Sequence, residues 1–353
     1  MAQFISFQPS DYFTPLLHTG NGSELVVSGV GFQPDFTWIK NRTNVDFHVL
    51  TDSVRGATKY IKSDNTTVET TNAEGLKSWQ SDGYTLGTQN QVNENTANFV
   101  GWNWKAGTTS GIATNGSTTI TPSSYSFDQT AGISILNYTG NITSGAKLAH
   151  GLGATPDFVM IKSLGATKDW GVYNKGMNSY VDPEDYGIEL NDAATQDNSD
   201  SYWNDTVPDS VNLTLGNGDK TNHSSGTMIA YCFAEKTGYS KFGSYSSNNT
   251  VKGPFIYTGF RPVFTMIKDN TGGNPWVIDD VKRETYNEME VPLKPNNTDA
   301  DYSGSAYGID LLSNGFKIRN NDSTYNGTGN DFIYAAFAEF QFVSSNAIPA
   351  VAR

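Results

Sequence analysis

Few residues of the sequence form patterns that catalysis requires. Glu184 and Asp185 are adjacent carboxylates of the kind used in glycoside hydrolysis, but they lie in a polar stretch that favours a solvated loop. The sequence contains no nucleophile elbow, zinc-protease motif or phosphate-binding loop. The four histidines fall at unrelated points of the chain: His18, His48, His150 and His223. The sequence therefore predicts no catalytic residues and a protein that is not an enzyme.

Two groups of oxygen-bearing side chains are candidates for a metal site. Residues 297–301 place Asn297, Asp299 and Asp301 at alternate positions, as in a calcium loop, but lack the bidentate glutamate of an EF-hand. A second, looser group consists of Asp192, Asp197 and Asp200. We predict no metal site and no cofactor, and calcium is the alternative.

Two tryptophans are candidates for ligand binding. Trp79 and Trp203 lie in polar surroundings outside the apolar segments of the chain. A tryptophan face beside Asn and Asp side chains can stack on a sugar ring while the polar groups bind its hydroxyls. The alternative is that both rings pack over one end of a hydrophobic core.

The composition narrows the class of protein. The 353 residues carry a net charge of −13, with 23 Lys and Arg against 36 Asp and Glu, so no basic surface for nucleic acid is expected. The single cysteine, Cys232, excludes an intrachain disulfide. The first residues lack the pattern of a secretion signal, and no apolar run is long enough to span a membrane. These features predict a protein made in the cytoplasm, without membrane insertion or a nucleic-acid partner.

Internal repetition is the most informative feature of the sequence. Residues 31–40, 153–162 and 259–268 share a proline, an aromatic residue two positions later and an apolar-Ile-Lys ending. Proline at a strand entrance is tolerated because no ladder donor is needed there. An aromatic residue follows each lysine after seven or eight positions: Phe47, Trp170 and Trp276. This spacing predicts three equivalent β-hairpins.

A second apolar segment closes each repeat. Residues 99–104, 228–233 and 332–337 carry apolar residues on both strand faces, as in strands buried on both sides. The last two are followed by Ala-Glu, whereas Lys105-Ala106 follows the first. Asp52 and Asp279 occupy similar places in the first and third repeats, with Asn174 in the second.

The repeats predict an all-β chain of three tandem β-sandwich-like domains with little helix. Domain 1 with its N-terminal segment would span 1–106, and the second and third domains 131–237 and 238–341. Residues 107–130, rich in Ser, Thr and Gly, would form a linker or arm, and 342–353 a C-terminal tail. The apolar residues of the N-terminal segment are unlikely to stay exposed. They predict either an anchor that docks on a sister chain or on a larger assembly, or an edge strand of domain 1.

Several motifs resemble a repeat found in virion proteins of marine bacteriophages. They are residues 7–13, 19–23 and 31–35, the Phe-Ala-Glu segments at 233–235 and 337–339, and the tail. The resemblance implies a virion structural protein, either a tail-fibre- or spike-like appendage or a capsid-mounted one, made in the host bacterium and involved in host attachment. It implies other virion proteins as partners, a host-surface glycan as a further partner, and a homo-oligomer with a trimer favoured. The alternatives are a carbohydrate-binding module, a capsid decoration protein without a receptor role and a glycan hydrolase.

Overall fold

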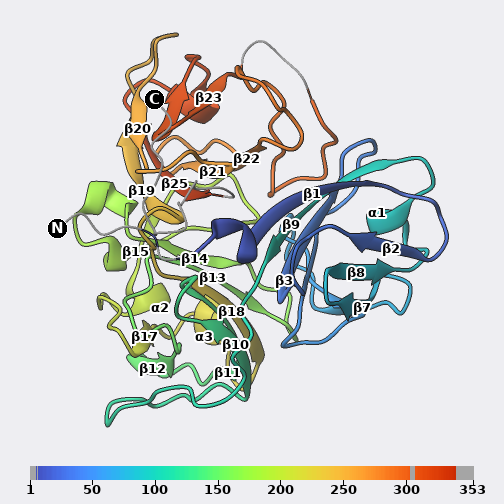
Figure 1. Ribbon diagram of the computed structural model, residues 1–353. Coiled ribbons are helices and arrows are strands. Elements are labelled where there is room, and N and C mark those ends of the chain that lie inside the picture. The colour runs from blue at the N-terminus through green and yellow to red at the C-terminus, as the bar shows by residue number, and fades with distance from the viewer. Residues whose placement is uncertain (1–4, 6, 303–306, 339–353) are drawn as a thin grey trace.

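A computed structural model describes residues 5, 7–302 and 307–338 of the chain. Strands dominate these residues, and each helical segment has only three or four residues. The all-β fold class with little helix is therefore confirmed. Three parts of the chain, here called unit 1 (residues 13–104), unit 2 (124–233) and unit 3 (240–337), lie around a common centre (Figure 1).

Unit 1 contains a four-stranded sheet and a three-stranded sheet. The larger sheet has the order β1 (Phe13–Thr19), β9 (Asn98–Trp104), β3 (Phe36–Asn41) and β4 (Val49–Asp52). The smaller sheet has the order β2 (Leu25–Ser28), β8 (Gly83–Leu86) and β7 (Leu76–Gln80). The remaining elements are the ribbon β5 (Lys59–Tyr60) with β6 (Thr70–Thr71) and the helix α1 (Asn90–Asn93), while η1 (Pro9–Asp11) precedes the unit.

Unit 2 has a five-stranded sheet and a two-stranded sheet. The larger sheet has the order β10 (Ser124–Asp128), β11 (Ile133–Thr139), β18 (Thr227–Phe233), β13 (Phe158–Ser163) and β14 (Gly171–Asn174). The smaller sheet pairs β12 (Ala146–Ala149) with β17 (Asn212–Leu215), and β15 (Tyr186–Gly187) pairs with β16 (Asp197–Asn198). The helical segments are η2 (Met177–Tyr180), η3 (Pro183–Asp185), α2 (Asp200–Trp203) and α3 (Asp219–Asn222).

Unit 3 resembles unit 1 in its strand order. The larger sheet has the order β19 (Ser240–Ser246), β25 (Asp331–Phe337), β21 (Phe264–Asp269) and β22 (Val277–Asp280). The smaller sheet has the order β20 (Phe255–Tyr257), β24 (Gly315–Ile318) and β23 (Ile309–Leu312), and α4 (Ser323–Asn326) precedes β25.

The last strand of each unit lies in the middle of its larger sheet. Strands β9, β18 and β25 each pair antiparallel with two strands of their unit: β9 with β1 and β3, β18 with β11 and β13, and β25 with β19 and β21. The registers of the three sets correspond. Phe36 lies opposite Trp104, Phe158 opposite Phe233, and Phe264 opposite Phe337. The three sheets therefore share one strand arrangement, and residues at matching register positions can be compared directly.

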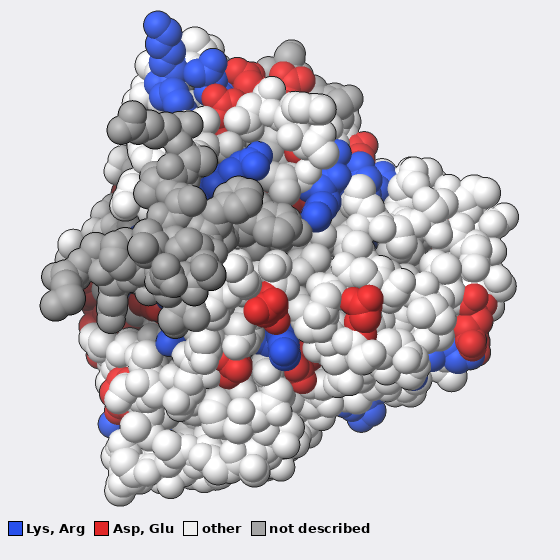
Figure 2. Space-filling model, in the orientation of Figure 1, with Lys and Arg blue, Asp and Glu red and all other residues white. Residues whose placement is uncertain are grey.

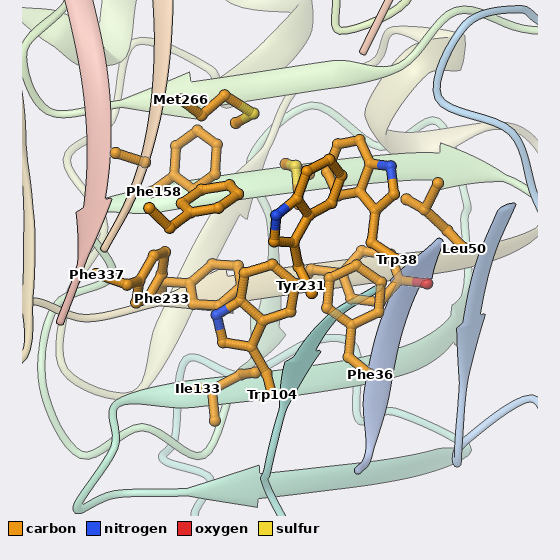
Figure 3. Packing of buried hydrophobic residues seen from close by; sticks show 14 of the residues in the cluster. Phe36, Trp38, Leu50, Trp104, Ile133, Phe158, Tyr231, Phe233, Met266 and Phe337 are labelled. Carbon is orange, nitrogen blue, oxygen red and sulfur yellow. The ribbon is translucent and has the colours of Figure 1, made fainter. Parts of the chain in front are cut away.

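Both faces of each larger sheet are covered, for two different reasons. One face packs against the smaller sheet of the same unit, which gives each unit a core of its own. The other face contributes to one cluster of buried residues from all three units (Figure 3). Trp104 is central to this cluster, because its ring lies within 6.3 Å of Phe36, Phe233, Phe264 and Phe337, measured between ring centroids. The three units are therefore joined by a shared core, which explains the two apolar faces of the closing strands.

The shared core tests several sequence predictions. Phe233 and Phe337 are each only 3% exposed, which confirms that they are core residues. The five tryptophans predicted to be core residues are also buried: Trp38, Trp102, Trp104, Trp170 and Trp276.

The N-terminal segment packs over one end of the shared core. Ile5 is buried, and the Phe7 ring contacts Tyr12 at 5.1 Å and Tyr239, which precedes β19, at 5.4 Å between centroids. Phe13 begins β1, an edge strand of the unit 1 sheet. The described residues of the segment thus bridge units 1 and 3. Phe4 and the C-terminal tail lie outside the described residues.

Residues 107–130, predicted to be a linker or arm, pack against unit 2. Strand β10 forms within this stretch and extends the sheet of unit 2. Residues 107–123, here called the arm, run along unit 2, and Ile120 forms a parallel bridge with Leu148 of β12.

Candidate functional site

Three buried lysines join each unit to a loop of a neighbouring unit. Lys40, Lys162 and Lys268 occupy the same position on β3, β13 and β21 and are 0% exposed. Each ammonium group donates to a loop carbonyl of a different unit: Lys40 Nζ to Thr298 O at 3.1 Å, Lys162 Nζ to Thr66 O at 3.2 Å, and Lys268 Nζ to Ala193 O at 3.1 Å. Burial lowers the pKa of each lysine to about 8. These lysines are the repeated Lys of the sequence pattern, so the signal was present, but its role in joining units was missed.

A second set of contacts runs between the same units. Trp170 Nε1 donates to Lys62 O at 2.9 Å, and Trp276 Nε1 donates to Glu189 O at 2.8 Å. The corresponding residue of unit 1 is His48, not Phe47 as predicted, because the register pairs Ile39 with Val49, Ile161 with Gly171 and Ile267 with Val277.

His48 is held in one tautomer by its neighbours. Trp38 Nε1 donates to His48 Nδ1 at 2.9 Å, so the ring proton is on Nε2, which lies 3.1 Å from Lys294 O of unit 3. Burial lowers the pKa of His48 well below its ordinary value and keeps the ring neutral. His48 is therefore a structural residue that joins units 1 and 3.

A third set closes the ring of units. Tyr231 Oη donates to Asp52 Oδ2 at 2.7 Å, Asn174 Nδ2 to Tyr334 O at 3.1 Å, and Trp102 Nε1 to Asp280 Oδ2 at 3.1 Å. Each contact joins the hairpin of one unit to the central strand of the next. The prediction that Asp279 corresponds to Asp52 was wrong by one residue, since Phe36 pairs with Asp52 and Phe264 with Asp280.

The hairpin aspartates of units 1 and 3, Asp52 and Asp280, also form buried ion pairs. Arg55 Nε lies 2.5 Å from Asp52 Oδ2, and Arg283 Nε lies 2.6 Å from Asp280 Oδ2, with both arginine side chains 1% exposed. Unit 2 replaces the pair by Asn174 and the buried Met177. The same site in the fold thus accepts either an ion pair or a neutral pair.

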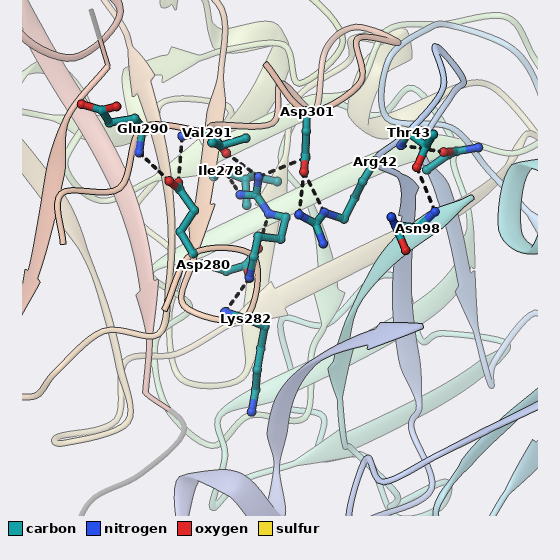
Figure 4. Close-up of polar contacts among 12 residues, drawn as sticks. Arg42, Thr43, Asn98, Ile278, Asp280, Lys282, Glu290, Val291 and Asp301 are labelled. Atoms are coloured by element: carbon teal, nitrogen blue, oxygen red, sulfur yellow. Dashed lines mark hydrogen bonds and ion pairs between the residues drawn. The ribbon is translucent and has the colours of Figure 1, made fainter. Parts of the chain in front are cut away.

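A half-buried ion pair joins units 1 and 3. Arg42 and Asp301 point toward one another, with Arg42 Nη2 2.7 Å from Asp301 Oδ2 (Figure 4).

The other side chains considered for a calcium loop contact one another or a lysine. Asn297 Nδ2 donates to Asp299 Oδ2 at 2.8 Å, and Lys294 Nζ lies 3.6 Å from the same oxygen. Within residues 5, 7–302 and 307–338, no group of three or more His, Cys, Asp or Glu side chains has a geometry suited to a metal ion.

A cleft lies between unit 1, the arm and β10. It has a volume of about 710 Å³, and its lining includes five Ser and Thr residues together with Tyr125 and Lys105. Asp35 lies at its wall and accepts hydrogen bonds from Ser53 Oγ at 2.6 Å, Ser126 Oγ at 3.2 Å and the Ala106 amide at 2.9 Å. Because its carboxylate is occupied by these donors, Asp35 is a positioning group rather than a free acid or base. A polar cleft with one aromatic ring suits a polyhydroxylated ligand.

The two tryptophans predicted to bind a ligand lie elsewhere. Trp203 is 0% exposed, and its Nε1 donates to Tyr186 O at 3.0 Å. The prediction for Trp203 was wrong, because no face of its ring is free to stack on a sugar. Trp79 lies on β7, partly buried against the core of unit 1, and its role stays a prediction. Neither residue lines the cleft beside the arm.

A buried acid in unit 3 predicts a pH-dependent stability. Asp279 is 1% exposed, accepts hydrogen bonds from Tyr325 Oη at 3.0 and 3.1 Å, and has its pKa raised by burial to about 7. In the unfolded chain an aspartate titrates near about 4. Between these values the unfolded chain releases a proton that the folded protein retains, so this residue lowers the free energy of unfolding as pH rises from about 4 to 7.

Asp279→Asn should remove this pH dependence. The amide oxygen still accepts from Tyr325, but no charge is buried, so the variant should exceed the wild type in stability by about 2–4 kcal/mol at pH 8. The difference should shrink toward zero near pH 4. Urea unfolding at both pH values measures it, and an equal difference at the two pH values would contradict the assignment.

The chain belongs to a family described as a domain of unknown function (DUF7483), whose model matches residues 8–340. The match covers all three units, so the family is defined over the whole three-unit ring rather than over one repeat. No curated protein sequence matches the chain. None of the described helices has the length and apolar character needed to cross a membrane.

Proposed function

We propose that this protein is a structural component of a bacteriophage virion, a surface appendage on the tail or capsid that takes part in host attachment. The observation that carries the proposal is the closed ring of three units. In that ring buried polar side chains form hydrogen bonds across the unit boundaries, to backbone carbonyls or to side chains of the neighbouring unit. Such an arrangement favours a rigid, non-enzymatic building block.

The surface supports the same proposal. On the face shown in Figure 2, Lys and Arg occur singly or in small groups among Asp and Glu. With a net charge of −13, this pattern favours partners other than nucleic acid. Other virion proteins are the proposed partners, and the virion the proposed location.

We also propose a homotrimer, as the resemblance to virion proteins implies. One chain already places three units around a shared core, so a trimer would join three complete rings. Sedimentation of the full chain distinguishes a trimer from a monomer.

Labelling of purified particles tests the proposal. Antibodies against the full chain, visualised by electron microscopy, should mark one defined position on intact virions, either at the tail or on the capsid. Absence of the protein from purified particles that contain the other structural proteins would overturn it.

A second candidate function is carbohydrate binding at the cleft beside the arm. The cleft combines hydroxyl groups, the Tyr125 ring and Lys105, which together suit a glycan. Tyr125→Ala should weaken binding at least tenfold on a glycan array without unfolding the protein. Trp79→Ala is the matched test of the alternative site on β7. Loss of binding only in Trp79→Ala would move the site to β7, and no binding by the wild type would remove this candidate.

A further inference from the structure

The smaller sheets of the three units end in edge strands that correspond to one another. β2, β12 and β20 each pair on one side with β8, β17 and β24, respectively. By register, one position is occupied by Val26, Lys147 and Phe255, and a second position by Ser28, Ala149 and Tyr257. The outer side of these strands can therefore be compared among the three units.

In unit 2 the outer side of the edge strand is occupied by the arm. Ile120 N donates to Lys147 O at 2.9 Å, and Ala149 N donates to Ile120 O at 3.0 Å. The Ile120 side chain is 7% exposed and belongs to the core of unit 2. The Thr-Thr-Ile-Thr segment of residues 118–121 thus lies along β12 and pairs with it through one parallel bridge at Ile120.

In unit 3 no described residue pairs with the corresponding side of β20. Pro254 O accepts from Ile318 N, and Thr258 N donates to Asn314 O, so residues 254, 256 and 258 face β24. The backbone groups of Phe255 and Tyr257 consequently point away from the sheet.

The side chains of this edge differ from those of an edge protected against association. Natural edge strands are blunted by charged residues or covered by another segment, and unit 2 has Lys147 there with the arm beside it. Unit 3 has Phe255, 44% exposed, and Tyr257, 64% exposed, with Val251 nearby in sequence at 63%. Unit 1 has no aromatic residue at the two positions, which carry Val26, 61% exposed, and Ser28. The aromatic residues occur at an edge that no described strand covers, where they add contact area for an incoming strand.

From these observations we infer that the outer edge of β20 binds an extended peptide segment of another protein by strand addition. The segment is uncharged and threonine-rich, carries a β-branched apolar residue and pairs parallel to β20, as the arm does on β12. Main-chain hydrogen bonds at residues 255 and 257 supply affinity, and the aromatic side chains select the edge of unit 3 over that of unit 1. This inference goes beyond the proposed function and does not depend on it.

A peptide copied from the arm is the probe. The fluorescein-labelled sequence of residues 116–124, Gly-Ser-Thr-Thr-Ile-Thr-Pro-Ser-Ser, is titrated with the full chain and followed by fluorescence anisotropy. Saturable binding is expected. Tyr257→Pro removes an outward N–H and should weaken binding at least tenfold, whereas Ser28→Pro, the matched change on β2, should alter it less than twofold.

A second probe leaves the protein unchanged. The same peptide with an N-methyl group on the isoleucine nitrogen lacks the donor that Ile120 uses and should bind at least tenfold more weakly. No binding of the unmodified peptide, or equal binding by Tyr257→Pro, would overturn the inference. Two further outcomes would overturn it, because in both the occupant of the edge would be the chain itself. The first is that the peptide binds only after residues 339–353 are deleted. The second is that the chain forms a dimer that Tyr257→Pro dissociates.

Discussion

Replacing Arg55 by methionine alone should lower the free energy of unfolding by about 3–5 kcal/mol. The Asp52 carboxylate is fully buried, and Arg55 Nε is its cationic partner at 2.5 Å. Without Arg55 the carboxylate keeps hydrogen bonds from Tyr231 and the residue 55 amide, but no positive charge compensates it. Chemical denaturation at pH 7 measures the loss.

Unit 2 provides the matched control for this change. It carries Asn174 and Met177 where unit 1 has Asp52 and Arg55. The double variant Asp52→Asn with Arg55→Met should therefore regain most of the lost stability and lie within about 1 kcal/mol of the wild type, because a buried ion pair can be replaced by well-packed neutral residues. A double variant no more stable than Arg55→Met would show that the two sites are not equivalent.

Phe337→Ala should destabilise the whole ring, by about 3–5 kcal/mol. Phe337 is 3% exposed and its ring contacts Trp104 of unit 1 at 5.7 Å and Phe233 of unit 2 at 5.6 Å between centroids. Truncation therefore opens a cavity at the meeting point of three units. The same range is expected for Phe233→Ala, which is equally buried.

Phe255→Ala is the matched control for this truncation, since its ring is 44% exposed in the same unit. It should change the free energy of unfolding by less than about 0.5 kcal/mol. Equal losses for Phe337→Ala and Phe255→Ala would contradict the position of Phe337 in the shared core.

The sequence predicted the strands better than their assembly. Proline at the strand entrance and apolar residues on both faces placed β3, β13 and β21, and the closing strands, correctly. The same two-sided pattern was interpreted as three separate sandwiches. Alternation of apolar residues shows that two faces are buried, but it does not show which part of the chain covers each face.

The candidate site was harder to predict. The repeated lysine was visible, yet a lysine at a strand end is ordinarily solvated, and only the loops of neighbouring units reveal its carbonyl partners. Trp203 was misassigned because its polar neighbours in sequence suggested an exposed ring, whereas it packs in the core of unit 2. The cleft beside the arm combines residues from distant parts of the chain, such as Asp35 and Ser126, so no local motif marks it.

Differential scanning calorimetry of the full chain tests the shared core most directly. Since Trp104, Phe233 and Phe337 pack together from three units, the units should unfold as one. We predict a single transition whose calorimetric enthalpy equals its van't Hoff enthalpy. Two or three resolved transitions, each with the enthalpy of about one unit, would contradict a shared core and indicate three independent domains.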